Sequence, residues 1–148
     1  MIRHNLAHWP LVLSAVRGSL TQEDQLAFFA EWAAWFDRGG SFATLRVFVD
    51  ADSLTRPQGG GKEAKAWLQA NAERLKTQVL GMATVVPPIH FEEMSRMNAE
   101  KLFGVPARTF EDPHKAISWL NSLLIDRYVD FDLRAAEKSL EGLVFALR

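Results

Sequence analysis

Residues 42–67 read FATLRVFVDADSLTRPQGGGKEAKAW, and they join an apolar strand, an acidic exit, a glycine turn and the start of a helix without a break. The apolar run at residues 45–49 is typical of a strand that is buried on both faces between helices. The run ends at Asp50, and three glycines at residues 59–61 then bring the chain to the next helical pattern. Ligand crevices in open α/β sheets lie beyond the carboxyl ends of such strands, so this loop is where we expect a site.

Strands and helices alternate on both sides of this central unit. The expected strands are residues 9–16, 45–49, 82–86 and 105–110, and the expected helices are residues 25–37, 62–79, 91–102 and 113–124. This alternation predicts an α/β fold in which about four helices pack on a central, mostly parallel sheet of four or five strands. Pro10 near the start of the first strand has no N–H group, so we expect an edge or antiparallel position for that strand.

Residues 127–148 depart from this alternation. Charged residues first alternate with Tyr128, Val129 and Phe131, and helical spacing of apolar residues then resumes over residues 133–147. We therefore expect one domain at residues 1–126 and a C-terminal extension at residues 127–148. The amphipathic helix of this extension packs either on the domain or on a partner.

Composition narrows the classes of function. Seventeen basic residues nearly balance 18 acidic ones, so the chain has no general attraction to nucleic acid or to anionic membranes. The absence of cysteine excludes disulfide and thiolate chemistry and fits a reducing cytoplasm. No apolar stretch reaches the roughly 20 residues that span a bilayer, and the N-terminus lacks the pattern of a signal peptide. We expect a soluble cytoplasmic protein without a transmembrane segment.

Motifs for metal binding and hydrolysis are missing from the sequence. His4, His8, His90 and His114 do not show the spacing of a metal site. No serine lies in the G-x-S-x-G pattern of a nucleophile elbow. We therefore expect neither a metal ion nor a cofactor.

Four short stretches together resemble one known superfamily. They are VRGSLT at residues 16–21, FVD at residues 48–50, MATVVP at residues 82–87 and PARTFEDPHKAISWL at residues 106–120. In this order they resemble the SpoIIAA-like branch of the STAS superfamily, whose members are small α/β domains related to anti-sigma factor antagonists. The resemblance covers roughly residues 6–124 and implies a non-enzymatic binding or regulatory module.

The same resemblance points to a phosphorylation switch, which can be compared with the residues present. Anti-sigma factor antagonists carry a phosphorylated serine in an aspartate-serine-serine-glycine element that opens the helix after the central strand. Here that place reads TRPQGGGK at residues 55–62, and Thr55 is the only hydroxyl residue between Ser53 and Lys62. The residues favour a loop shaped by glycine over a phosphorylation switch.

The loop itself is the first candidate binding site. Its candidate residues are Asp50, Asp52, Ser53, Thr55, Gly60, Gly61 and Lys62. Glycine allows backbone amides to approach an anion at a helix N-terminus, although the Walker pattern is incomplete here. The two aspartates could act as paired carboxylates, but aspartates at a strand end more often cap a turn or the next helix.

An aromatic stripe on the helix at residues 25–37 is the second candidate. Phe28, Trp32 and Trp35 recur at helical spacing beside the main apolar face of this helix. If part of the stripe is exposed, it forms a surface for a partner or an apolar ligand. The alternative is that the three side chains belong to the core, which is the more common role of such stripes.

The preferred interpretation is a non-enzymatic, STAS-like module that binds another protein or a second copy of itself. Its contact surface would be the loop at residues 50–62 with the neighbouring helix faces. The alternative is a small-ligand-binding domain for an anion or a lipid-like molecule, held between the glycine turn and the aromatic helix, as SEC14-like relatives of this architecture imply. An enzyme that uses Asp50 or Asp52 is the third hypothesis.

Overall fold

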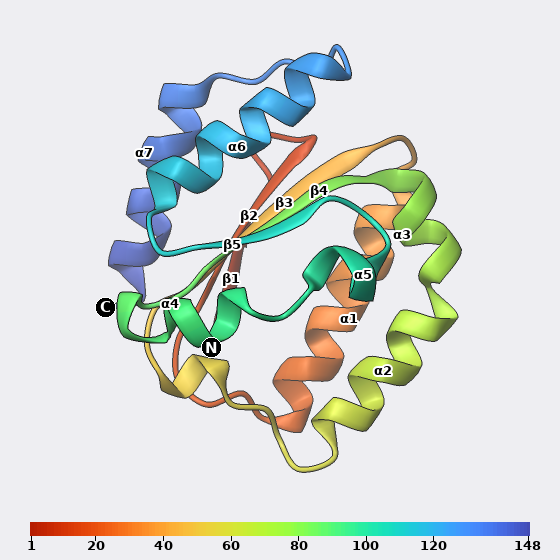
Figure 1. Cartoon of the computed structure of the whole chain (residues 1–148), viewed down its shortest axis with the longest axis vertical. Helices are drawn as coiled ribbons and strands as arrows, with labels where there is room; N and C mark the ends of the chain where they lie inside the picture. Colours follow the sequence, from red (N-terminus) through yellow and green to blue (C-terminus); the bar gives the residue numbers. More distant parts are fainter.

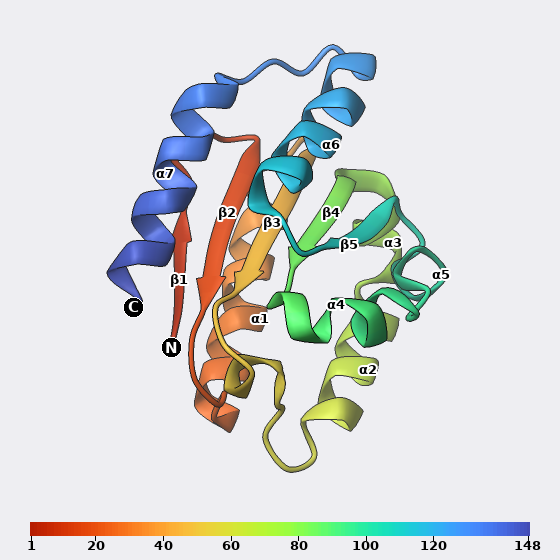
Figure 2. The ribbon, with the colours of Figure 1, turned by 60° about the vertical axis from the view of Figure 1, so that its left-hand side comes forward.

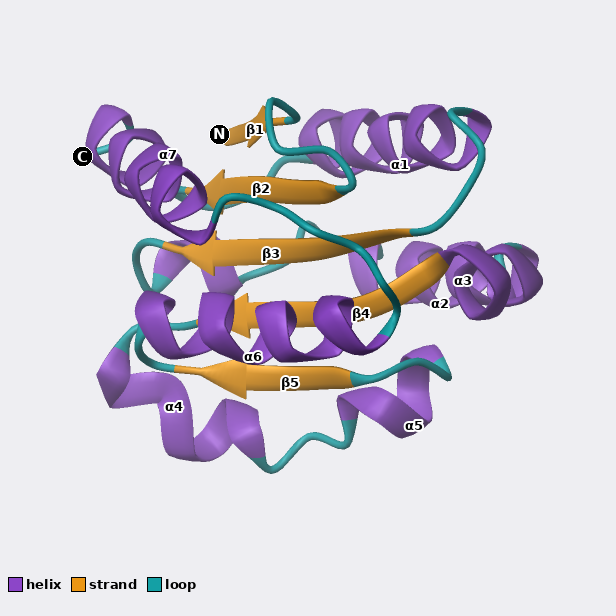
Figure 3. Ribbon diagram, turned by 90° about the horizontal axis from the view of Figure 1, so that it is seen from above, coloured by secondary structure: helices purple, strands orange, loops and turns teal.

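One five-stranded sheet runs through the centre of the molecule and has helices on both faces (Figure 1). The computed structural model describes residues 1–148. The strands are β1 (Ile2–Asn5), β2 (Leu11–Val16), β3 (Phe42–Phe48), β4 (Val79–Val85) and β5 (Ala107–Phe110). They lie in chain order; β1 is antiparallel to β2, and β2 to β5 are parallel (Figure 3). The predicted α/β fold with a mixed, mostly parallel sheet is confirmed.

The edge of the sheet differs from the expectation. The predicted first strand, now β2, lies inside the sheet, because β1 pairs with it from Ile2 opposite Val16 to Asn5 opposite Leu13. Pro10 precedes β2, so its missing N–H group removes no hydrogen bond from the ladder. The antiparallel edge strand is β1, which the sequence analysis missed because Ile2 is the only apolar residue in IRHN.

Seven α-helices surround the sheet. They are α1 (Gln22–Asp37), α2 (Gly60–Ala70), α3 (Ala72–Gln78), α4 (Pro88–Ser95), α5 (Ala99–Phe103), α6 (Pro113–Asp126) and α7 (Leu133–Ala146), and a short 3₁₀ turn spans Asp52–Leu54.

Two of the helices expected from the sequence are each divided in two by an asparagine. The side chain of Asn71 donates a 2.9 Å hydrogen bond to the Trp67 carbonyl and separates α2 from α3. Asn98 accepts a 3.0 Å hydrogen bond from the Lys101 amide and caps the start of α5. Asparagine competes with helical hydrogen bonding in this way because its short side chain bonds to nearby backbone groups.

The two faces of the sheet are covered by different parts of the chain. Parallel strands that follow chain order with right-handed crossovers receive all of their crossover helices on one face. Residues of α1 and α3 accordingly share one hydrophobic cluster, and residues of α6 and α7 share the other. Figure 2 shows α6 and α7 in front of the sheet and α1 behind it. Ala136 and Leu140 of α7 are buried in the same cluster as Leu13 and Leu45 of the central strands.

The aromatic stripe of α1 belongs to the core. Trp32 and Trp35 are each 2% exposed, and both pack with Phe42 of β3, whereas Phe28 is half-buried. The terminal helix does not cover this stripe, because α7 packs on the opposite face of the sheet. The two tryptophans are therefore not an exposed surface for a partner in this fold.

Replacing Trp35 by alanine will destabilise the protein by about 3–5 kcal/mol, because it leaves a cavity in the core. Urea unfolding measures the change. Phe145→Ala is the control, since Phe145 is 80% exposed and its loss is expected to cost less than about 0.5 kcal/mol. Equal, small losses for the two variants would contradict the core position of Trp35.

Candidate ligand-binding cavity

Asp50 anchors the loop that follows β3. Its carboxylate accepts hydrogen bonds from the Gly18 amide at 3.1 and 3.2 Å and from the Ser53 amide at 2.9 Å. The Ser53 hydroxyl donates a 2.6 Å bond back to the Asp50 carbonyl, and Ser53 is buried. These bonds hold the loop after β3 against the loop after β2. Asp50 and Ser53 therefore have structural roles.

Asp52 and Thr55 lie farther out on the same loop. The Thr55 hydroxyl donates to the Asp52 carbonyl at 2.7 Å and lies 3.3 Å from the Ser19 hydroxyl. The Asp52 carboxylate is exposed and makes no hydrogen bond or ion pair. No group of three His, Asp or Glu side chains is placed to hold a metal ion.

The glycine turn is held against α1 by Gln25. The Gln25 side-chain amide donates to the Gly60 carbonyl at 3.1 Å and to the Glu63 carboxylate at 3.2 Å. A Cβ atom on Gly60 would lie 2.9 Å from the Gln25 oxygen and 3.0 Å from Pro57, so a larger residue there would displace these side chains. Lys62 is exposed at the start of α2, and Gly61 faces a cavity.

This cavity has a volume of about 420 Å³ and lies on the face of the sheet that carries α1. Its walls come from α1, α2, β3, β4 and the two helices α4 and α5, which we call the α4–α5 arm. Thirteen of its 20 lining residues are hydrophobic, and none is Asp or Glu. Three are cationic: Arg46 inside, and Arg56 and Lys65 on exposed positions at the rim. The lining is therefore apolar with positive charge only.

Arg46 belongs to a row of polar residues that crosses the whole sheet. The row consists of one residue from each strand, and these residues pair in register across the sheet: His4, Ser14, Arg46, Thr84 and Thr109. Residues paired across neighbouring strands point to the same face, so the row lies on the side of the sheet that carries α1. A polar row on a face that helices cover is unusual, because the covered faces of such sheets are normally apolar.

The charge of Arg46 has no counter-charge in the protein. Its guanidinium carbon lies 4.3 Å from the centre of the Phe28 ring, and its Nε is enclosed without a hydrogen-bond partner. Burial, and to a smaller extent the positive charge of Arg56, lower the pKa of Arg46 to about 10. Arg46 therefore stays cationic at neutral pH, in contact with an aromatic ring but paired with no carboxylate.

His4 and Ser14, at the other end of the row, form a hydrogen-bonded pair. His4 Nδ1 lies 2.7 Å from the Ser14 hydroxyl. Burial, followed by the charge of Arg46, lowers the pKa of His4 to about 4, so its ring is neutral. Ser14 is only 3% exposed and is not among the residues that line the cavity. The pair ties β1 to β2 and presents no accessible nucleophile.

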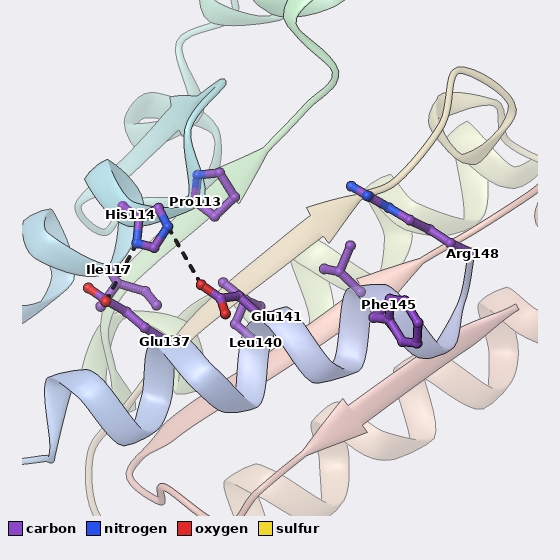
Figure 4. Close-up of a pocket in the computed structure, with 9 residues that line it drawn as sticks. Pro113, His114, Ile117, Glu137, Leu140, Glu141, Phe145 and Arg148 are labelled. Atoms are coloured by element: carbon purple, nitrogen blue, oxygen red, sulfur yellow. Dashed lines mark ion pairs between the residues drawn. The ribbon is translucent and has the colours of Figure 1, made fainter.

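A smaller cavity of about 260 Å³ lies between α6 and α7 (Figure 4). His114 of α6 points toward Glu137 and Glu141, which stand one turn apart on α7, with N–O distances of 3.5 and 3.7 Å. These side chains are largely exposed except Glu137, and exposed ion pairs contribute little to stability. The arrangement joins the two helices, and the remaining charged residue of the lining, Arg148, is exposed.

Arg46 was not predicted as a site residue, although the sequence contains a signal for it. The apolar run at residues 45–49 contains this arginine, and arginine is rarely placed in a strand buried on both faces unless it is paired. Ser14 and Thr84 interrupt two other apolar strands in the same way. Only the register of the sheet shows that the three interruptions lie side by side.

No protein-family model matches this chain, and comparison with the curated proteins and with the solved structures finds no similar protein. The resemblance to the SpoIIAA-like branch of the STAS superfamily therefore stays a prediction. None of the helices is long and apolar enough to cross a membrane.

Asp50→Ala will destabilise the protein by about 1–3 kcal/mol, because the Gly18 and Ser53 amides lose their acceptor. The matched control is Asp52→Ala, which removes an exposed carboxylate without side-chain bonds and is expected to change stability by less than about 0.5 kcal/mol. Chemical unfolding of both variants measures the difference. If the two substitutions had the same effect, Asp50 would not be the anchor of the loop.

Proposed function

We propose that the protein binds a small anionic molecule with an apolar body in the cavity between α1, α2 and the α4–α5 arm. One observation supports the proposal most strongly: Arg46 carries an unpaired positive charge inside this cavity, and no Asp or Glu lines it. Arg46 is half-buried with its Nε enclosed, and a partly buried charge without a partner is costly. A bound carboxylate or phosphate removes this cost by pairing with the guanidinium.

The size and walls of the cavity suit such a ligand. Small-molecule sites typically enclose about 300–1,000 Å³ and combine apolar walls with a few polar groups, and this cavity of about 420 Å³ falls in that range. Arg56 and Lys65 at the rim add positive charge at the entrance, which attracts anions from solution. These features support the small-ligand hypothesis, in which the ligand lies between the glycine turn and the aromatic helix.

The protein-binding, STAS-like regulatory module remains a separate prediction. Its expected contact loop, residues 50–62, supplies part of the cavity wall through Ser53, Thr55 and Gly61. No contact on this loop favours a protein partner over a small ligand. The enzyme hypothesis also lacks support, because the hydrogen bonds of Asp50 give it an anchoring role and Asp52 stands apart from the cavity lining.

The proposal is tested with naphthalene sulfonate, a fluorescent anion whose apolar body is small enough for this cavity. We expect saturable binding at one site, and about tenfold or greater weakening in Arg46→Met, because a charge-assisted hydrogen bond contributes about 1.5–3 kcal/mol. Arg127→Met is the control, since Arg127 is exposed and lies outside the cavity lining. Equal affinity in the two variants would contradict the proposal.

Stability of the empty protein provides a second readout for the same variant. If Arg46 is kept for a ligand, its replacement by methionine of similar length leaves the free energy of unfolding unchanged or raises it, because a partly buried, unpaired charge is removed. A loss greater than about 2 kcal/mol, the value for a cation–π contact that is shielded from water, would indicate that Arg46 serves the fold.

A further inference from the structure

We infer that the ligand is an aromatic anion: a planar aryl body of about a dozen non-hydrogen atoms that carries one carboxylate or phosphate head. The inference rests on the proposed function and adds to it the chemical class of the ligand. It follows from the composition of the walls, the volume of the cavity, and the hydrogen-bonding groups that remain free to meet the head.

The walls are aromatic to an unusual degree. Six of the lining residues are Phe or Trp: Phe28, Phe29, Trp32, Phe48, Trp67 and Phe103. Trp67 and Phe29 already stack, with ring centroids 5.1 Å apart and planes inclined by 8°. Aromatic rings prefer offset-stacked or edge-on partners and gain free energy beyond the area they bury. A planar ring system can use these contacts, whereas a flexible alkyl chain cannot.

Two methionines complete the lining opposite α2. Met82 comes from β4 and Met94 from the α4–α5 arm. Thioether sulfurs make favourable contacts with aromatic rings and adapt to irregular shapes. The part of the wall that Met82 and Met94 form therefore also favours an aromatic ligand.

The volume limits the size of the ligand. At about 30 Å³ for each water-sized group, the 420 Å³ of the cavity holds roughly 14 such groups. A bicyclic aromatic acid fits this limit, whereas a long-chain fatty acid exceeds it.

The head of the ligand must accept hydrogen bonds. The hydroxyls of Ser53 and Thr55 already donate to backbone carbonyls, and the Gln25 amide already donates to Gly60 and Glu63. The side-chain donors that remain in the lining are the indole N–H groups of Trp32 and Trp67 and the cationic side chains. Only the cationic side chains carry a charge for the anionic head, and Arg46 is the least exposed of them. Guanidinium groups bind carboxylate and phosphate in a planar, two-point geometry.

The fold also assigns an orientation to the ligand. Arg46 and Arg56 lie toward the carboxyl end of β3 and the loop beyond it, whereas Met82, Leu68 and Phe103 lie toward the opposite end of the strands. The anionic head therefore lies at the loop end of the cavity, and the aryl body extends along the sheet toward α5. This orientation places the ring system beside Trp67.

Isothermal titration calorimetry of the full chain with four probes tests the inference. The probes are naphthoate, naphthyl phosphate, decanoate and naphthylmethanol, which have similar numbers of non-hydrogen atoms and differ in head or body. We expect naphthoate or naphthyl phosphate to bind about tenfold more tightly than decanoate, from the added free energy of aromatic contacts. Naphthylmethanol, which lacks the charge, is expected to bind at least tenfold more weakly than the better aryl anion.

The outcomes separate this inference from the proposed function. Decanoate binding as tightly as naphthoate, with both weakened by Arg46→Met, would overturn the aromatic class and leave the anion site intact. Failure of all three anions to bind would overturn both. The ratio between naphthoate and naphthyl phosphate identifies which head the site prefers, and either preference supports an aromatic anion.

A matched pair of tryptophan variants tests where the body lies. Trp67→Leu is expected to reduce the preference for naphthoate over decanoate to about twofold or less, because it removes the stacking partner. Trp119→Leu is the control: Trp119 is also half-buried, but it packs on Phe110 on the α6 side of the sheet. Comparing two ligands within one variant cancels any general loss of stability. An unchanged preference in Trp67→Leu would contradict the orientation.

Discussion

The order of the strands constrains everything else in this molecule. Because β2 to β5 are parallel and follow chain order, right-handed crossovers place every connecting helix on one face. The opposite face then depends on whatever follows β5. Here α6 and α7 cover it, with Ala116, Leu120, Ala136 and Leu140 fully buried against the strands. The C-terminal helix therefore completes a core that the crossovers alone leave half exposed.

The face of the sheet that carries the crossover helices combines a hydrophobic cluster with a row of polar residues. It holds the cluster of α1 and α3 around Trp32 and Trp35 at one end of the strands, and at the other end the row of polar residues with Arg46 at its centre. The α4–α5 arm that closes the cavity contains no fully buried residue, so its local stability is expected to be low. A wall of this kind allows a ligand to enter without disturbing the rest of the core.

The asymmetry between the two faces also bears on function. On the α6–α7 face, the charged residues that line the smaller cavity are Glu137 and Glu141, which lie close to His114, and the exposed Arg148. On the crossover face, the charged residues that line the larger cavity are all positive, and the half-buried Arg46 has no ion pair. Natural proteins tend to keep a locally unfavourable group where it serves a site. This contrast is the reason why the larger cavity, and not the smaller one, carries the proposed function.

Periodicity in the sequence predicted most of the fold and little of the site. Strands such as β3 and β4 and helices such as α6 follow from local apolar patterns, and the position of the loop after β3 follows from the end of its apolar run. The breaks at Asn71 and Asn98 and the edge strand β1 were missed, because they depend on single side-chain hydrogen bonds and on pairing with β2. The predicted site residues Asp50 and Ser53 proved to be anchors of the loop. Arg46 was missed because its role depends on its neighbours in other strands and on the absence of a carboxylate nearby. The spacing of residues along the sequence shows neither of these.

The most direct test of the central claim is a crystal structure of the protein with bromonaphthoate, in which the anomalous signal of bromine locates the ring. The account predicts bromine in the cavity beside Trp67 and a carboxylate within about 3.2 Å of the Arg46 guanidinium. A carboxylate bound elsewhere, or an Arg46 side chain paired with an acidic group of the protein itself, would contradict it.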